Sequence, residues 1–470
     1  MSKDIKVRNI RHEYLHSFMW NLIVVVISLV AADVLLHQTG PIGNRTMMAI
    51  YGADGVVTLL FMYWMEKYSV TVSGLYESTV INVLSNIYTF IIISFVNLVF
   101  FFSKEKLIMD AILALSKIVG IYLSDLILYA IRNNPKLRRK PKMLIIGATA
   151  KNFYRMKRIK YGVLTNYDSW YESIEGMNYE EVKAFIEEKF PQYEAICVLD
   201  GINEEEYALA VGKATEQNKD LFIVPKMIDV GKTNARLARF DDVLTLYMPE
   251  KELSGIEKFM KRFMDIALSL IGCVLAAIPM IIIALLIKLT SKGPVFYKQT
   301  RYTKDKKEFE IYKFRTMIPD AEKLSGPKFA EKNDPRITPI GKILRACRLD
   351  ELPQILNILK GDMSIVGPRP ERPVFVEQFE QEIENYDYRF EVKAGLTSLS
   401  HVYGRYSTYI HDRTYYDLFY ITHYSLLLDL KIILLTTKTM LLKSAAEGED
   451  DFKEKTVAQE GQEVETVEKE

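Results

Sequence analysis

Four apolar stretches open this chain of 470 residues, and each is long enough to cross the hydrocarbon core of a bilayer as a helix. They cover about 18–36, 46–65, 80–102 and 107–131. Lysines and arginines precede the first stretch and follow the fourth, at positions 3, 6, 8 and 11 and at positions 132, 136, 138, 139, 140 and 142. Basic flanks of this kind favour the cytoplasmic side of a membrane. An even number of spans allows both flanks to lie on that side. The sequence therefore predicts a transmembrane four-helix bundle over 1–135.

Three acidic residues, Asp33, Asp54 and Asp125, lie within or near these stretches. Because a charged group is costly in lipid, we expect them to face the interior of the bundle. Interhelical packing is the favoured role and ligand binding the alternative. No clear small-residue cleavage site follows the first stretch, which argues against a signal peptide.

Between about 141 and 250, short apolar runs alternate with helical segments. The runs M-L-I-I-G, A-I-C-V-L-D and L-F-I-V-P predict buried strands, with helices near 180–189 and 204–217 between them. This alternation predicts a Rossmann-like parallel α/β domain. Its first turn, 147–152, carries only one of the glycines that a dinucleotide fingerprint requires for close approach of a pyrophosphate. A structural or regulatory module is therefore favoured over nucleotide binding, which stays open.

A fifth apolar segment, 266–287, is also long enough to span. Basic residues lie on both sides of it: Lys261 and Arg262 before, and Lys288, Lys292, Lys298 and Arg301 after. Both ends therefore favour the cytoplasm, and Pro279 offers a point at which the helix can break. We predict a helix-break-helix over 259–288 that re-enters the membrane and returns on one side.

Three polar residues at the start of this segment, Lys261, Asp265 and Ser269, recur every four positions and share one helical face. We expect this face to lie at the headgroup boundary and to join the re-entrant helix to the globular domain.

Two adjacent carboxylates, Asp350 and Glu351, lie within an arginine-rich stretch. Pro353 cannot continue a helix through them, but it suits the first turn of a new helix over 354–359 that ends at Gly361. The pair is therefore expected at a helix N-terminus, where the helix dipole favours negative charge. An ionised aspartate there could act as a nucleophile.

Long ordered motifs over about 259–440 resemble those of the bacterial polyprenyl-phosphate glycosyl-1-phosphate transferases. They are K-R-F-M-D-I-A-L-S at 261–269, G-P-V-F-Y-K-Q-T-R at 293–301, K-F-R-T-M at 313–317, D-P-R-I-T-P-I-G at 334–341 and the stretch from R-A-C-R-L-D-E-L-P-Q to V-G-P-R-P at 345–370. The resemblance implies a mainly α-helical catalytic domain over 256–443. It also implies transfer of a sugar 1-phosphate from a UDP-sugar to undecaprenyl phosphate, with release of UMP, at the start of capsule, exopolysaccharide or O-antigen synthesis.

The resemblance further assigns roles to the carboxylate pair. Asp350 would attack the β-phosphate of the UDP-sugar and form an aspartyl phosphosugar intermediate. Mg²⁺ is the implied cofactor, with Asp350 as a ligand, since this ion usually takes one or two carboxylates together with substrate phosphates. Glu351 would support the metal or accept a proton, and both roles stay open.

Arginines are the expected phosphate contacts, because the guanidinium group can grip phosphate oxygens with two parallel hydrogen bonds. Arg345 and Arg369 are the leading candidates. The weaker candidates are Arg301, Lys313 and Arg315. The chain departs from the family pattern near 394–405, where Ala394 replaces a common proline and L-T-S-L-S-H-V-Y-G-R follows. This region is expected to shape the sugar pocket or an oligomer contact.

The end of the chain changes character twice. Lys431 and Lys438 lie seven apart among leucines, which predicts an amphipathic helix in the membrane interface. Residues 444–470 contain ten acidic and three basic residues and predict a disordered acidic tail. Because the whole chain has a net charge of +1, the remainder carries +8, which suits an anionic bilayer and phosphate ligands. The three cysteines form no close pair, which argues against a disulfide framework or a zinc site.

The expected partners are a UDP-sugar, undecaprenyl phosphate and the lipid bilayer, with a homodimer left open and no nucleic acid. The expected location is the bacterial cytoplasmic (inner) membrane, with the catalytic domain on the cytoplasmic face. Two other functional classes stay open. The α/β domain would suit a membrane-anchored nucleotide-sugar dehydratase or epimerase, although its missing glycines count against this. A non-catalytic scaffold for polysaccharide assembly would not need the pair Asp350 and Glu351.

Overall fold

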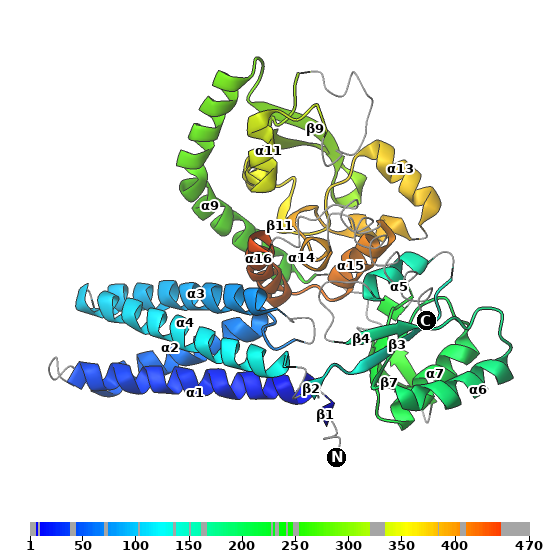
Figure 1. Cartoon of the computed structure of the whole chain (residues 1–470). Helices are drawn as coiled ribbons and strands as arrows, with labels where there is room; N and C mark the ends of the chain where they lie inside the picture. The colour runs from blue at the N-terminus through cyan, green and yellow to red at the C-terminus, as the bar shows by residue number, and fades with distance from the viewer. Residues whose placement is uncertain are drawn as a thin grey trace. The chain divides into compact units, whose positions relative to one another are not determined.

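The computed structural model is mostly helical and contains some parallel sheet (Figure 1). It describes residues 6–7, 10–37, 44–69, 74–101, 104–134, 138–149, 152–160, 167–226, 229–230, 235–240, 243–247, 253–319, 334–383, 385–404 and 410–442. The chain divides into two compact units, Met1–Lys226 and Met227–Glu470. The predicted acidic tail, 444–470, lies outside the described residues.

Four long helices dominate the first part of the first unit. They are α1 (Ile10–His37), α2 (Asn44–Trp64), α3 (Leu75–Phe101) and α4 (Lys104–Arg132). Each of α1 and α3 contacts both α2 and α4, so the four helices lie side by side (Figure 1). Leu75–Val99 and Leu107–Ile131 are long and apolar enough to cross a membrane, while the apolar parts of α1 and α2 are shorter, Leu15–Ala31 and Ala49–Trp64.

Polar and charged side chains are buried between these helices together with apolar ones, and many apolar side chains are exposed on their outer surface. Asp54 on α2 accepts a hydrogen bond from Lys117 on α4, and Lys117 also donates to Thr58 over 2.8 Å. Asp125 pairs with Lys67 at 2.8 Å. Both aspartates are buried, which confirms that they face inward and link helices. The side chain of Asp33 lies outside the described ones. Charged side chains that are buried between helices, with apolar side chains exposed outside, are typical of helices surrounded by lipid.

A four-stranded parallel sheet follows, in the order β4-β3-β5-β6. Its strands are β3 (Lys142–Ile146), β4 (Asp168–Tyr171), β5 (Ala195–Val198) and β6 (Asp220–Ile223), and its helices are α5 (Phe153–Lys160), α6 (Tyr179–Lys189) and α7 (Glu204–Glu216), with the short η1 (Phe190–Gln192) after α6. Capping boxes start α6 at Asn178 and α7 at Asn203. These elements match the three predicted strands and both predicted helices. A separate short pair joins β1 (Lys6–Val7) to β2 (Arg138–Arg139).

The strand order reverses between β3 and β5, where ligands of open α/β sheets usually bind. Here the chain's own side chains meet at that point. Asn152, beyond β3, donates to Asp200, beyond β5, over 2.8 Å, and Arg155 forms an ion pair with the same carboxylate. The backbones also approach closely, because a Cβ on Gly201 would lie 2.4 Å from the carbonyl oxygen of Gly147. These contacts favour the structural-module interpretation of this domain.

The second unit begins with the antiparallel strands β7 (Arg236–Phe240) and β8 (Val243–Tyr247) and the long helix α9 (Gly255–Thr290). An antiparallel pair, β9 (Phe296–Tyr302) and β10 (Glu308–Phe314), and a parallel pair, β11 (Ser364–Val366) and β12 (Gly395–Thr397), form its small sheets. The other elements are η2 (Lys304–Lys306), α11 (Pro339–Ala346), η3 (Leu349–Glu351), α12 (Gln354–Lys360), α13 (Pro373–Glu382), η4 (Tyr386–Glu391), α14 (Leu399–Tyr403), α15 (Ile410–Thr422) and α16 (Leu426–Leu441).

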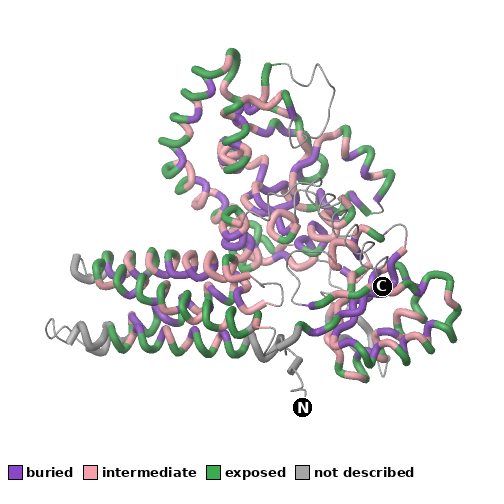
Figure 2. The backbone as a smooth tube through the Cα atoms, in the orientation of Figure 1, coloured by how far each residue is buried: buried purple, intermediate pink, exposed green. Residues whose placement is uncertain are grey.

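Helix α9 is one continuous helix that contains Pro279 and curves along its length (Figure 1). The predicted break is therefore a bend instead, because a proline removes one backbone hydrogen bond and kinks a helix whose neighbouring turns can remain intact. The outer face of α9 is exposed and apolar (Figure 2), with exposed fractions of 77% at Val274, 70% at Ile278 and 82% at Leu289.

Both halves of α9 pack on the same unit. In the second half, Ile283 and Ile287 share a core with Phe314 and Leu344. The first half uses the predicted polar face: Asp265 accepts hydrogen bonds from Ser364 Oγ and Ile365 N, each over 3.0 Å, and Lys261 pairs with Asp429 of α16 at 2.8 Å.

The same face continues at Ser269, which is buried. Lys261 and Asp265 thus contact the globular domain, whereas the expected position of this face at the headgroup boundary stays a prediction. The contacts of Asp265 also hold β11, the strand that leads to Arg369.

Candidate active site

The turn between α11 and α12 presents the carboxylate pair. Arg348 adopts a left-handed conformation (φ 54°), which is uncommon for a residue with a side chain, and the single turn η3 then carries Asp350 and Glu351. Pro353 precedes α12, and the helix ends at Gly361, whose φ of 100° suits glycine. The predicted stop and restart of the helix is confirmed, and the two carboxylates lie where the new helix begins.

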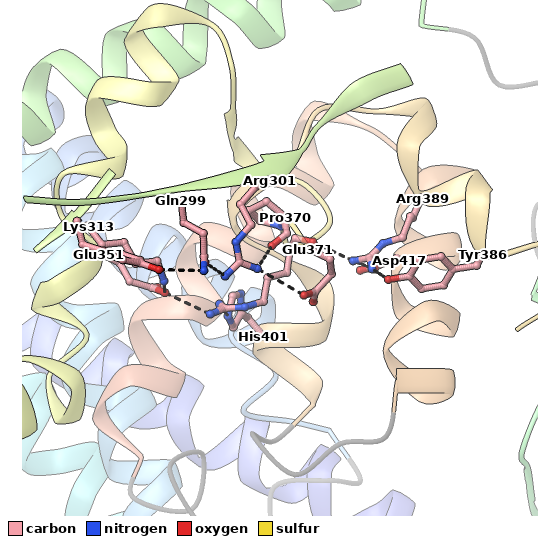
Figure 3. A network of polar contacts seen from close by, with 12 residues as sticks. Gln299, Arg301, Lys313, Glu351, Pro370, Glu371, Tyr386, Arg389, His401 and Asp417 are labelled. Atoms are coloured by element: carbon pink, nitrogen blue, oxygen red, sulfur yellow. Dashed lines mark hydrogen bonds and ion pairs between the residues drawn. The ribbon is translucent and has the colours of Figure 1, made fainter. Parts of the chain in front are cut away.

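Glu351 is held by two cations (Figure 3). Its Oε1 accepts from Lys313 Nζ of β10 over 2.7 Å and from Arg369 Nη2 over 3.3 Å. Burial alone would raise the pKa of Glu351, but Lys313 and Arg369 outweigh it and hold this pKa well below its usual range. Glu351 is therefore an anion that fixes both cations in place.

Asp350 lies in a different environment although it is the adjacent residue. Its carboxylate has no hydrogen-bond or ion-pair partner on another side chain in the described part of the chain. Burial raises the pKa of Asp350 and the charge of Glu351 raises it further, while Lys313 and Arg345 lower it in part. Two neighbouring carboxylates whose pKa values are pushed apart are suited to different chemical tasks.

Arg369 is positioned from two further directions. Its Nη1 lies 2.7 Å from His401 Nε2, and because a guanidinium group can only donate, this nitrogen must accept. The imidazole is then neutral, with its proton on Nδ1, 3.2 Å from Ser398 Oγ. Burial, Arg369 and Arg348 lower the pKa of His401 well below its usual range, in agreement with a neutral ring. Arg389 donates to the carbonyl oxygen of Arg369 over 2.9 Å.

The other predicted cations divide between the site and the scaffold. Arg301 donates to Gln299 Oε1 over 2.6 Å and to the carbonyl oxygen of Pro370 over 3.0 Å (Figure 3). Arg345 Nε donates a hydrogen bond to Thr316 Oγ1 over 2.9 Å, and the positive charge of Arg345 lowers the pKa of Asp350.

Arg315 has other partners than these residues. It donates to the carbonyl oxygens of Lys292 and Ser291 just beyond α9, over 2.7 and 3.0 Å. The guanidinium group of Arg315 thus holds the backbone that directly follows that helix.

A pocket brings most of these residues together. Its lining consists of Arg301, Ile311, Lys313, Glu351, Gln354, Arg369, Pro370, Gly395 and Leu396. The cationic side chains outnumber the single carboxylate, which suits an anionic ligand such as a diphosphate. Gln354 and His401 were not among the predicted site residues. Only the departure of the 394–405 region from the family pattern hinted at His401.

A metal ion held by protein ligands alone is not supported, because the described residues contain no group of three or more histidine, cysteine, aspartate or glutamate side chains suited to one. Mg²⁺ bound mainly by substrate phosphates needs only one or two carboxylates. Asp350 fits that requirement, since no described side chain competes for its carboxylate.

Comparison with known proteins places this site in a family. The family model for bacterial sugar transferases matches residues 256–443. An exopolysaccharide production protein of Rhizobium leguminosarum bv. phaseoli is 39% identical over 192 residues, which cover 96% of that protein and 39% of this chain. The chain belongs to the bacterial sugar transferase family.

This bacterial sugar transferase also resembles longer relatives. The UDP-N-acetylgalactosamine-undecaprenyl-phosphate N-acetylgalactosaminephosphotransferase of Aeromonas hydrophila is 44% identical over 191 residues, or 40% of this chain and 45% of that protein. The UDP-glucose:undecaprenyl-phosphate glucose-1-phosphate transferase of Escherichia coli K12 is 35% identical over 260 residues, or 54% of this chain and 55% of that protein. The matches span about half the length of these two relatives.

Proposed function

We propose that this bacterial sugar transferase moves a sugar 1-phosphate from a UDP-sugar to undecaprenyl phosphate and releases UMP, as the first membrane step of capsule, exopolysaccharide or O-antigen synthesis. The observation that carries the proposal is the pair of carboxylates in unlike environments at a cationic pocket. Asp350 is available for attack, whereas Glu351 holds Lys313 and Arg369. The names of the relatives in Aeromonas and Escherichia describe transfers of this type.

The first step is a displacement at the β-phosphorus of the UDP-sugar. A carboxylate oxygen of Asp350 attacks, the bond from that phosphorus to the bridging oxygen breaks, and UMP leaves with the electron pair. The product is an aspartyl phosphosugar. Lys313 and Arg369 lie where they can neutralise charge on the phosphoryl oxygens, which is the main protein contribution to phosphoryl transfer.

The second step regenerates the enzyme. A phosphate oxygen of undecaprenyl phosphate attacks the same phosphorus, and the Asp350 carboxylate leaves with the electrons of its bond to phosphorus. Undecaprenyl diphosphate-sugar is released. Mg²⁺, when bound through Asp350 and substrate phosphates, would supply additional neutralisation of phosphoryl charge.

The membrane arrangement of the proposal follows from the acceptor, whose phosphate is at the bilayer surface. We place 1–135 in the bacterial cytoplasmic membrane as a four-helix bundle, 141–250 as a Rossmann-like domain and 256–443 as the catalytic domain on the cytoplasmic face. Helix α9 would enter and leave through that face. Support comes from the packing of both its halves on one unit and from its exposed apolar outer face.

The nucleophile provides the test. Asp350→Asn keeps the shape of the side chain but cannot form the acyl phosphate, so UMP release should fall by at least about 10³-fold while the melting temperature stays near that of the wild type. Mass spectrometry of wild-type enzyme given UDP-sugar without acceptor should show the phosphosugar on the peptide that contains Asp350. UMP release near the wild-type rate in Asp350→Asn would contradict the proposal.

A further inference from the structure

One buried side chain at the pocket has an unused hydrogen-bond donor. Gln354, the first residue of α12, is only 3% exposed, and its Nε2 has no hydrogen-bond partner among the described residues. The same residue lines the pocket with Lys313, Glu351 and Arg369. A buried donor without an acceptor destabilises a folded protein, so such a group in a binding pocket points to a partner that arrives with the ligand.

A second buried amide on the same helix shows what a purely structural role looks like. Asn357, one turn after Gln354, is 0% exposed. Its Nδ2 donates to the carbonyl oxygen of Glu310 over 2.7 Å, and its Oδ1 accepts from Tyr312 N over 3.0 Å. Asn357 therefore ties α12 to β10 with both ends of its amide, whereas Gln354 makes no such contact.

Arg301 adds a second unused donor to the pocket. Its Nη1 donates to the carbonyl oxygen of Pro370 and lies 3.6 Å from the carboxylate of Glu371, and its Nη2 donates to Gln299. Its buried Nε has no hydrogen-bond partner in the described part of the chain. The carboxylate of the pocket lining, Glu351, is already engaged by Lys313 and Arg369. The pocket thus offers donors for which its own lining supplies no acceptor.

We propose that Gln354 is a donor-substrate-binding residue, whose Nε2 donates a hydrogen bond to an acceptor oxygen of the UDP-sugar, beside Arg301. The identity of the ligand rests on the proposed function. The oxygen belongs to the diphosphate, to the nucleoside or to the transferred sugar, and each of these groups carries oxygens that can accept a hydrogen bond.

The substitution Gln354→Met tests this proposal, because methionine has a similar length and no polar hydrogen. The melting temperature of the ligand-free protein should be unchanged or higher, since an unsatisfied buried group is removed. The KM for the UDP-sugar should rise about two- to tenfold, as expected for one lost hydrogen bond, with a smaller change in kcat.

Asn357→Leu is the matched control on the same helix. It should lower the melting temperature, because it leaves the Glu310 carbonyl and the Tyr312 amide without partners, and it should leave the KM of the folded enzyme near the wild-type value. If Gln354→Met instead lowered the melting temperature and left the KM unchanged, Gln354 would be a structural residue and the proposal would be overturned.

Thermal-shift titrations locate the acceptor oxygen and do not depend on turnover. Pyrophosphate, UMP, UDP and the UDP-sugar are compared on wild-type protein and on Gln354→Met. If pyrophosphate shifts the melting temperature of Gln354→Met less than that of the wild type, the oxygen belongs to the diphosphate. If UMP shows this difference and pyrophosphate does not, the oxygen belongs to the nucleoside. If only the UDP-sugar shows it, the oxygen belongs to the sugar. Equal shifts in both proteins for all four probes would overturn the inference. Absence of UMP release by the wild type would reject only the proposed function.

Discussion

Asp350 and Glu351 differ in surroundings far more than in chemistry. Glu351 is committed to Lys313 and Arg369, so it can position charge but is poorly placed to attack a phosphorus atom. Asp350 has no such commitment, and burial together with Glu351 raises its pKa. A less stabilised carboxylate is also a more basic one, and it retains the lone pair that a displacement requires.

The raised pKa of Asp350 predicts the acid side of the pH profile. In the proposed mechanism the attacking form is the carboxylate. Activity should therefore be present above this pKa and be lost as the pH falls through it, beginning at a higher pH than for an ordinary aspartate. Arg345 lowers the pKa of Asp350, so Arg345→Gln should move the acid limb of kcat/KM to higher pH. Lys298→Gln, at an exposed pair with Glu310, is the control and should leave the limb in place. An unmoved limb in Arg345→Gln would show that another group controls it.

His401 is expected to act through Arg369. His401→Ala removes the acceptor from Arg369 and should lower kcat/KM for UMP release by about tenfold or more, as for a hydrogen bond to a charged group. His401→Gln offers an amide oxygen as acceptor and should recover part of this loss. Equal losses in both variants, accompanied by equal falls in melting temperature, would mean that His401 only fills space.

At the scale of elements, the end of α9 depends on the residue that follows β10. Arg315 follows that strand and donates to the carbonyl oxygens of Ser291, the C-cap of α9, and of Lys292, the next residue. We therefore expect Arg315→Met to lower the melting temperature by several degrees while the KM for the UDP-sugar stays within about twofold. A large rise in KM with an unchanged melting temperature would show that Arg315 binds the substrate and would contradict its structural role.

Local signals in the sequence predicted the elements well. The restart of the helix at Pro353, its end at Gly361 and the three strands of the α/β domain all follow from short-range rules about proline, glycine and apolar runs. The sequence predicts a break at Pro279, whereas α9 is continuous through this residue, because the sequence does not show how far the neighbouring turns are supported by packing.

Long-range pairing set the limit of prediction at the site. Lys313 meets Glu351 across 38 positions, and Arg369 meets His401 across 32, and no periodicity in the sequence encodes either contact. The family resemblance supplied the proposed role of Asp350, but only the structure shows that Arg315 binds backbone carbonyl oxygens while Arg369 contacts Glu351 and His401. The same holds for Gln354, whose importance rests on the hydrogen bond it lacks.

At the scale of the whole molecule, the membrane topology decides whether the two proposed substrates can meet. If α9 returns to the side from which it entered, the exposed Lys292 lies on the cytoplasmic face with Lys142. In a variant whose three native cysteines are replaced by alanine, an impermeant thiol reagent should label Lys292→Cys and Lys142→Cys only from the cytoplasmic side. Thr39→Cys, between the first two apolar stretches, should be labelled from the outside and serves as the control.

The proline supplies the matched perturbation. Pro279→Leu restores a backbone donor and removes the clash of the ring with the preceding turn, which stabilises a straight helix by about 3 kcal/mol. Part of the population should then cross the membrane, so that labelling of Lys292→Cys from the cytoplasm and UMP release fall together. A straight α9 would carry the second half of the helix away from Phe314 and Leu344, and the turn that bears Asp350 packs against that same core. Labelling of Lys292→Cys from the outside in the protein with Pro279 intact would contradict the re-entrant topology.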